Sequence, residues 1–308
     1  MQDDRLKRVR ILAQLLTLLV VLVLVISAYL RLNGAGLGCA NWPECYGQIL
    51  LSEPVLHTDF ARILHRVVAT LALLLGFYLA WDCLRPAALK PVARYVTLLV
   101  GLMILLTVIG IWSSSPHRAW ASFANMLGGM GLVVLSWRVV LATRTDAEQA
   151  RPAGPLWLLH AGILALVLAV ALGSLIGARY ATISCTTTPD CAGVWWPVSG
   201  AWAAFNPFVH VETALSLGDP GGVALHLVHR YSAVAALLLL GIAGLQALLA
   251  EATRRRASAM LALLALEFAL GSLTVVSGFS LWLAIAHSVS AAALLAAAMQ
   301  LRLRIKTG

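Results

Sequence analysis

Eight long apolar segments constrain this chain more than any other feature of its sequence. They span residues 11–32, 60–81, 92–113, 119–142, 155–178, 223–250, 258–279 and 281–301. A helix of about 20 apolar residues crosses the hydrocarbon core of a bilayer. Inside lipid, a chain must satisfy its backbone hydrogen bonds as helices or as a closed barrel, and barrel strands alternate over about ten residues. These segments are continuously apolar, so the sequence predicts an all-α integral membrane protein with eight transmembrane helices.

The composition also favours a membrane protein over a soluble one. The chain is 61% hydrophobic and 11% charged, whereas soluble domains are about half apolar and about a quarter charged. Its net charge of +9 would suggest nucleic-acid binding only if the basic residues formed a patch on a soluble domain, and none is predicted. The segment 11–32 follows a basic stretch, but it is too long for a signal peptide and lacks a small-residue cleavage site. We expect it to be retained.

The basic residues predict the orientation in the membrane. By the predicted topology, 16 of the 22 lysines and arginines fall on one side. They are Arg5, Lys7, Arg8, Arg10, Arg85, Lys90, Arg94, Arg138, Arg144, Arg151, Arg254, Arg255, Arg256, Arg302, Arg304 and Lys306. Because short cytoplasmic loops are rich in lysine and arginine, we expect a multi-pass protein of the bacterial cytoplasmic (inner) membrane with both termini in the cytoplasm. The two longest loops, 33–59 and 179–222, would then face outward.

A pattern of two cysteines followed by a histidine–arginine pair occurs twice. In each copy the cysteines lie six positions apart, and the histidine–arginine pair stands near the start of a long apolar segment. The first copy is Cys39, Cys45, His65 and Arg66, and the second is Cys185, Cys191, His229 and Arg230. The duplication predicts two pseudo-repeated four-helix bundles, an N-terminal half at 1–150 and a C-terminal half at 151–308.

The four loop cysteines are expected to form two disulfides. Cys39 with Cys45, and Cys185 with Cys191, each lie within one loop on the outer side, where bacteria permit disulfides. Zinc binding is the alternative, although zinc sites usually have closer cysteines and additional ligands. The disulfides could staple the loops or take part in redox chemistry, and the sequence leaves both roles open.

Histidines at matching depth predict a bound cofactor. His229 and His287 lie about five or six residues into segments that enter from the outer side, or roughly 8–9 Å at 1.5 Å per residue. Two imidazoles on different helices suit the two faces of a haem iron, and helical bundles commonly hold such sites. The alternative is a pair of histidines that hydrogen-bond between helices. His65 lies at a similar depth in its own segment.

Arginines near these histidines have two interpretations. Arg66 and Arg230 could snorkel toward the membrane interface, or they could bind haem propionates through charge-assisted bonds. Arg31 and Arg179 end their helices at the same level. Snorkelling is the expected role of this second pair, and propionate binding is the alternative.

Two further polar residues lie within the apolar segments. His226, one turn before His229, is expected to face the interface, with contact to the haem as the alternative. Glu267 is deep inside segment 258–279, where an ionised carboxylate is costly. It is predicted to be protonated or hydrogen-bonded to a neighbour, and a role in proton handling is also open.

The chain resembles the haem A synthase family. The resemblance rests on RLNGAGLGCANWPECYGQ at 31–48, CTTTPDCAGVWWP at 185–197, HLVHR at 226–230 and AIAHS at 284–288, and it extends over nearly the whole chain. Members oxidise a methyl group of haem O to the formyl group of haem A for terminal oxidases. The resemblance implies a permanent haem b between His229 and His287, and a haem O site in the N-terminal half with His65 as one ligand. It also implies that a cysteine pair, here Cys39 and Cys45, assists the reaction.

The same resemblance implies partners. Haem O synthase would supply the substrate, a membrane quinone or another donor would exchange electrons, and a terminal oxidase would be the destination of the product. A homo-oligomer is left open.

The chain departs from the family pattern in the N-terminal half. Asn125 stands where the family has a histidine opposite His65, and Arg62 stands where it has a glutamate three residues before that histidine. Glu267 stands where a glutamine is common. Guanidinium stays charged and cannot act as a base. The main hypothesis is therefore haem A synthase activity, and one alternative is a diverged paralogue that binds only haem b and acts in electron transfer or oxidase assembly. A haem carrier without a redox role is a third hypothesis.

Overall fold

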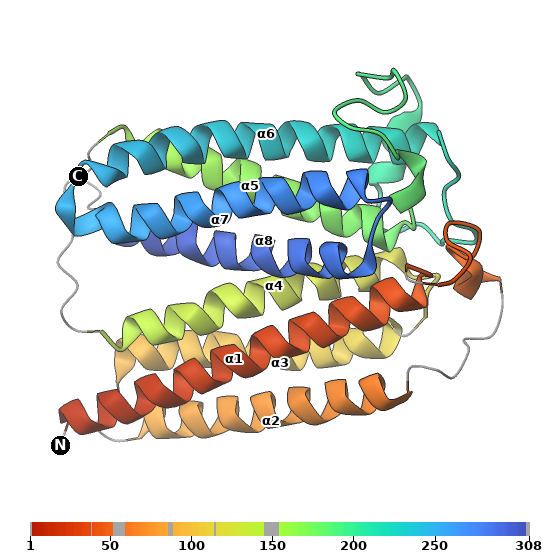
Figure 1. Ribbon diagram of the computed structural model, residues 1–308. Coiled ribbons are helices and arrows are strands. Elements are labelled where there is room, and N and C mark those ends of the chain that lie inside the picture. Colours follow the sequence, from red (N-terminus) through yellow and green to blue (C-terminus); the bar gives the residue numbers. More distant parts are fainter. Residues whose placement is uncertain are drawn as a thin grey trace.

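The computed structural model describes residues 2–37, 39–51, 59–85, 89–113, 115–144 and 154–305, and their fold is helical (Figure 1). The long helices are α1 (Gln2–Gly34), α2 (Asp59–Leu84), α3 (Lys90–Ser113), α4 (Ala119–Ala142), α5 (Leu156–Ala178), α6 (Pro220–Leu248), α7 (Glu251–Val276) and α8 (Leu281–Arg302). The 3-10 turns η1 (Gln48–Leu50), η2 (Thr182–Ser184) and η3 (Ala201–Phe205) lie in the loops. Within these described ranges, eight helices are long and apolar enough to cross a membrane, so the predicted fold class is confirmed.

Local capping explains why α6 begins before the apolar segment predicted at 223. Asp219 is its N-cap, and its side chain accepts a hydrogen bond from the Gly222 N–H at 2.8 Å. Pro220 occupies the first turn, where its fixed backbone angle suits a helix start and its missing N–H costs nothing. The helix therefore extends one turn into the outer loop, and this extension carries His226 and His229 on a continuous helix.

The helices pack as two sets of four. In the first set α1 contacts α2, α2 contacts α3, α3 contacts α4, and α4 contacts α1. The second set repeats this order from α5 to α8. The sets meet where α4 contacts α5 and α8, and where α1 contacts α8. The division at residue 150 and the internal repeat of sequence stay predictions.

The two ends of the bundle differ in what they carry. Figure 1 shows both termini at one end and the two long loops at the other. At the terminal end, Arg8 Nη2 lies 3.0 Å from both carboxylate oxygens of Asp82 and so joins α1 to α2. Two residues used to predict the orientation, Arg151 and Lys306, lie outside the described residues. The orientation of this end toward the cytoplasm stays a prediction.

Large apolar side chains cover the outside of the bundle. On α2, for example, Ile63, Val67, Leu71 and Leu74 are exposed. Such a surface would be a liability in water, whereas lipid tails are as apolar as these side chains. The fold therefore carries apolar side chains on its outer surface as well as in its core, and a small number of polar groups lie among the buried apolar ones.

Candidate functional site

The predicted histidine pair comes together inside the second set of helices. His229 on α6 and His287 on α8 have ring centres 6.4 Å apart, with the two ring planes at 85°. Two imidazoles that bind one metal through one nitrogen each have ring centres about 6 Å apart, because a metal–imidazole bond is about 2 Å long. The separation of these rings therefore fits a single metal ion between them.

Each of the two imidazoles has an oxygen atom of the preceding helix beside its Nδ1 atom. His229 Nδ1 lies 2.8 Å from the Ala169 carbonyl oxygen on α5, so this nitrogen donates and Nε2 is left as the ligand atom. His287 Nδ1 lies 3.0 Å from Glu267 Oε1 on α7. This close pair lacks hydrogen-bond geometry, since the buried His287 Nδ1 and Glu267 Oε2 have no hydrogen-bond partner among the described residues. Partners at the second nitrogen are typical of metal-bound histidines, because they fix the tautomer and the ring orientation.

Two glycines give these rings their space. A Cβ atom on Gly173 would lie 3.2 Å from His229 Cε1, and a Cβ atom on Gly271 would lie 3.0 Å from His287 Cε1. Each glycine follows the group that contacts Nδ1 by four residues, Ala169 on α5 and Glu267 on α7. Our sequence reasoning missed both glycines, although the pentapeptide ALGSL occurs at 171–175 and again at 269–273. That repeat was the signal that could have found them.

The first set of helices arranges its candidate residues differently. His65 on α2 is half-buried, while Arg62 and Arg66 on the same helix are exposed. Within the part of the chain that the structure describes, the His65 ring makes no hydrogen bond or ring contact. Asn125 lies five residues after Trp120 on α4, just as His287 lies five residues after Trp282 on α8. Asn125 therefore lies as far from the start of α4 as His287 lies from the start of α8.

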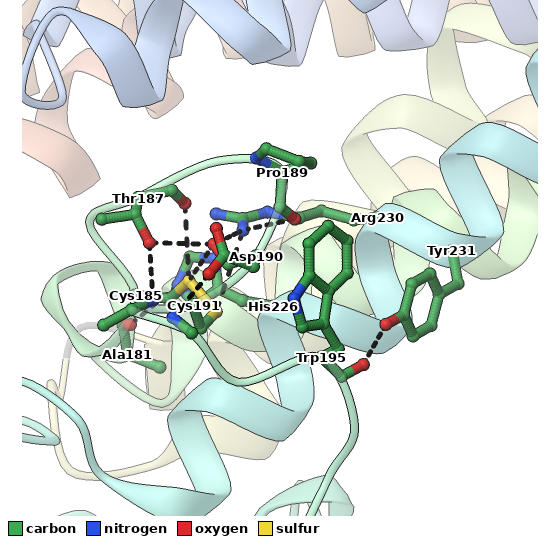
Figure 2. Close-up of a disulfide and its surroundings, with 12 residues drawn as sticks. Ala181, Cys185, Thr187, Pro189, Asp190, Cys191, Trp195, His226, Arg230 and Tyr231 are labelled. Carbon is green, nitrogen blue, oxygen red and sulfur yellow. Dashed lines mark hydrogen bonds between the residues drawn. A yellow bond between two sulfur atoms is a disulfide. The ribbon is translucent and has the colours of Figure 1, made fainter.

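Arg230 joins the histidine helix to the second cysteine loop (Figure 2). Its Nη1 donates to the carbonyl oxygens of Pro189 at 3.2 Å and Asp190 at 2.8 Å, and it lies 3.8 Å from Cys191 Sγ. Its Nη2 is buried and has no hydrogen-bond partner among the described residues. The guanidinium therefore does not simply snorkel, and one buried N–H group stays available to an anion.

The cysteines form the two predicted disulfides. Cys185 and Cys191 are bonded and buried beside α6, and Cys39 and Cys45 are bonded in the first outer loop. In the second loop, Thr187 Oγ1 accepts a hydrogen bond from the Ala192 N–H at 2.7 Å and donates to the Asp190 carbonyl oxygen at 2.9 Å. This disulfide is therefore held in a hydrogen-bonded turn.

The first outer loop is tied to the second half of the chain. The Tyr46 hydroxyl donates to Thr182 Oγ1 at 2.8 Å and lies 3.2 Å from the Thr182 nitrogen, whose N–H donates to it. Burial raises the pKa of the Tyr46 phenol, and burial also raises the pKa of the neighbouring Tyr180 to about 12. Both phenols therefore stay protonated at neutral pH, and the Tyr46 hydroxyl keeps the proton that it donates to Thr182 Oγ1.

The prediction that His226 faces the membrane interface is wrong. Its side chain is buried, and its Nε2 lies 3.0 Å from the Ala181 carbonyl oxygen. The outer loop from Arg179 onward folds over the start of α6, as the contacts of η2 and η3 with that helix show. The position of a loop over a helix depends on tertiary packing, which the sequence pattern did not reveal.

Arg31 and Arg179 also depart from the expected snorkelling. The Arg179 Nε and Nη1 atoms are buried without a hydrogen-bond partner among the described residues, and burial lowers the pKa of its guanidinium. Arg31 reaches from α1 to α5, where its Nη1 would lie 2.9 Å from a Cβ atom on Gly177. Buried cationic donors of this kind fit an anionic group that comes with a ligand.

Comparison with known families extends these observations. The sequence matches the family COX15-CtaA, described as cytochrome oxidase assembly protein, over residues 10–56 and 122–299. The matched parts contain both cysteine pairs and both facing histidines. The stretch 57–121 between them is unmatched, and it contains α2 and α3 with His65 and Arg62.

Similar proteins cover most of the chain. A heme A synthase of Shewanella oneidensis is 27% identical over 300 residues, which cover 89% of this chain and 89% of that protein. A heme A synthase of Halalkalibacterium halodurans is 24% identical over 247 residues, or 77% of this chain and 75% of that protein. A protoheme IX farnesyltransferase of Thermus thermophilus is 27% identical over 288 residues, which cover 89% of this chain and 44% of that protein. The family match spans well over half of the chain, so the resemblance read from its loops and histidines is confirmed: the chain belongs to the COX15-CtaA family of cytochrome oxidase assembly proteins.

Proposed function

We propose that this protein is a membrane oxidoreductase of the haem A synthase type, which converts haem O to haem A. The observation that carries the proposal is the His229–His287 pair, held at metal-binding separation in a chain that matches heme A synthases over most of its length. In the reaction a ring methyl becomes a formyl group: with water as the source of the oxygen atom, R–CH3 and H2O give R–CHO, four protons and four electrons. These electrons leave the substrate, so in this step a quinone would act as their acceptor and not as the donor expected from the sequence. A haem-binding protein in the membrane suits this chemistry, because both the substrate and an electron acceptor such as a quinone dissolve in lipid.

In the C-terminal half, 151–308, a haem b would be held by His229 and His287. The residues fit that group, because the two ring centres are 6.4 Å apart and an oxygen atom on the preceding helix lies beside each Nδ1, so that Nε2 would be the ligand atom. When bound, haem b would supply electron transfer. Arg230, through its unpaired buried Nη2, would bind a propionate.

The N-terminal half, 1–150, would hold haem O as the substrate and release haem A as the product. His65 would be one ligand, and Arg66 on the same helix would pair with a propionate. Asn125 is a poor iron ligand beside an imidazole, so one face of the substrate iron would lack a strong ligand. Cys39 and Cys45, at the same end of the bundle as the outer loops, would assist the reaction as a redox pair.

The remaining proposals concern location and partners. The protein would lie in the bacterial inner membrane with both termini in the cytoplasm. A haem O synthase would supply its substrate, and a terminal oxidase would receive its product. The match to most of this chain within a longer protoheme IX farnesyltransferase supports a close link between the two steps.

The test is co-expression of the full chain with a haem O synthase in a host that makes no haem A, followed by extraction and chromatography of the haems. We expect haem A, and we expect a His65→Ala variant to accumulate unchanged haem O. If the wild-type protein yields only haem b and unchanged haem O, the proposal fails. The diverged-paralogue alternative, which binds haem b without methyl oxidation, would then hold.

A further inference from the structure

A cavity lined by arginines lies at the end of the bundle that carries both termini. It has a volume of about 300 Å³. Its walls are Arg144, which follows α4, then Arg255, Arg256 and Ala259 on α7, and Ala297 and Gln300 on α8. Gln300 lies thirteen residues along α8 from His287, or about 20 Å at the rise of a helix. The cavity is therefore separate from the histidine site, and it lies where the first set of helices meets the second.

The positive charge of this cavity is not balanced within the described part of the chain. None of the ion pairs formed there involves Arg144, Arg255 or Arg256. Arg304, beyond the end of α8, is also close enough to repel the Arg256 charge. Like charges gathered in a concave site repel one another, and the site attracts a counter-ion.

Arg256 and Gln300 also present hydrogen-bond donors. Arg256 Nη1 donates to the Ala252 carbonyl oxygen at 2.8 Å, whereas its buried Nε has no partner among the described residues. A buried donor without an acceptor costs free energy. Gln300 Oε1 accepts from Trp137 Nε1 at 2.9 Å, which leaves the Gln300 amide nitrogen to donate at the cavity wall. The walls thus need an anion that accepts several hydrogen bonds.

We propose that this cavity binds a phosphate-bearing anion. Guanidinium groups bind phosphate through paired N–H donors, and basic pockets between transmembrane helices bind phospholipid headgroups. The ligand would be the headgroup of an anionic phospholipid or a soluble phosphate. Because it would touch α4, α7 and α8 together, it would stabilise the contact between the two sets of helices.

The test uses the full chain purified in detergent and stripped of lipid. Dioleoyl phosphatidylglycerol or inorganic phosphate is added, and bound lipid is measured by native mass spectrometry and the thermal midpoint by light scattering. We expect one of the two probes to bind and to raise the midpoint, and the Arg256→Gln variant to bind it about tenfold more weakly, as expected for loss of a charge-assisted contact. The probe that shows this dependence identifies the source of the phosphate.

Two further variants control this measurement. Arg94→Gln removes an exposed charge at the same end of the bundle but outside the cavity, and it should bind like the wild type. Arg144→Gln lies beyond the end of α4, and it repeats the test if Arg256→Gln does not fold. Equal binding by the wild type and the cavity variants, or equal loss in Arg94→Gln, would overturn the proposal.

The carboxylates that follow Arg144 in the sequence need a separate test. Asp146 and Glu148 lie outside the described residues. Binding of the probe to a chain that carries both Asp146→Asn and Glu148→Gln tests whether these carboxylates occupy the cavity. Binding that is unchanged in this chain supports the proposal. Binding gained only after these substitutions overturns it, because the protein's own carboxylates would then be the ligand.

Discussion

The two sets of helices share one order of helix contacts, but they differ in the side chains that they offer to a ligand. In the second set, His229 and His287 face each other with ring centres 6.4 Å apart. In the first set, the residues predicted to play the same part are His65 and Asn125, so one imidazole is present where the other set has two. The same helical framework can carry either set of side chains, because the helices depend on long apolar segments and a ligand depends on one residue.

The glycines near His287 and Asn125 also pack against different kinds of side chain. In the second set, Gly271 on α7 leaves room for the His287 ring on α8. In the first set, the glycine is on α4, and a Cβ atom on Gly128 would collide with Leu106 of α3. One glycine accommodates an imidazole and the other an apolar side chain. The contact between α3 and α4 is thus apolar one turn from Asn125, whereas the contact between α7 and α8 includes the polar pair Glu267 and His287.

The largest expected effect is the loss of a haem from the second set. In a His287→Ala variant one of the two proposed axial ligands is gone, and we expect the visible spectrum of stably bound haem b to be absent from the purified protein. His210→Ala, which changes an exposed loop histidine, should keep the spectrum. A haem spectrum that persists in His287→Ala would show that the comparison between the two sets rests on the wrong ligands.

Asn125→His should make the first set resemble the second. The substitution supplies the missing imidazole opposite His65, so we expect the haem bound per chain to rise roughly twofold, with a second six-coordinate spectrum. Haem extraction and electron paramagnetic resonance measure both quantities. Asn125→Gln, which adds bulk without an imidazole, is the matched control. If Asn125→His and Asn125→Gln bind equal amounts of haem, α2 and α4 do not face one another as α6 and α8 do.

Gly271→Ala tests the space that the second set reserves for its ligand. The added Cβ atom would lie 3.0 Å from His287 Cε1, and overpacking of this kind typically costs about 1–3 kcal/mol. We expect a lower thermal midpoint and less bound haem. Gly241→Ala on α6 meets nothing within 4 Å and should be neutral. Equal behaviour of the two variants would mean that the glycine is incidental.

Glu267→Gln should have the smallest effect of the four. The carboxylate beside His287 Nδ1 raises the basicity of that ligand, so the neutral amide should raise the reduction potential of the haem by on the order of tens of millivolts. Potentiometric titration of the visible bands measures the shift. Glu251→Gln, at the exposed start of α7, is the control. If the reduction potential stays constant or falls in Glu267→Gln, the Glu267 carboxylate does not influence the haem ligand.

Much of the fold could be predicted because it depends on local sequence. A long apolar segment has few structures open to it in lipid, and cysteines six residues apart within one loop are natural partners. The matching depth of His229 and His287 could likewise be counted from the ends of their segments. Contacts between helices could not be predicted in this way, because they depend on which helices are neighbours.

The contacts that the sequence did not reveal depend on backbone atoms and on loop positions, which no particular residue type marks. The Ala169 carbonyl that orients His229 is a backbone atom, and any residue at that position would provide it. The burial of His226 depends on a loop that folds over α6, and the hydrogen bond to the Ala181 carbonyl follows from that position. Gly173 and Gly271 did have a signal, the repeated ALGSL, and a search for short repeats would have found it.

The hydrogen bonds between Tyr46 and Thr182 have a mechanical consequence. They fasten the first outer loop to the second half of the chain, whereas the opposite end of the bundle gathers arginines that repel one another. The two sets are thus held by hydrogen bonds at the outer-loop end, whereas at the other end like charges oppose the Trp137–Gln300 contact between α4 and α8. Any separation of the two sets of helices would therefore begin at the end with the termini, and the outer loops would open last.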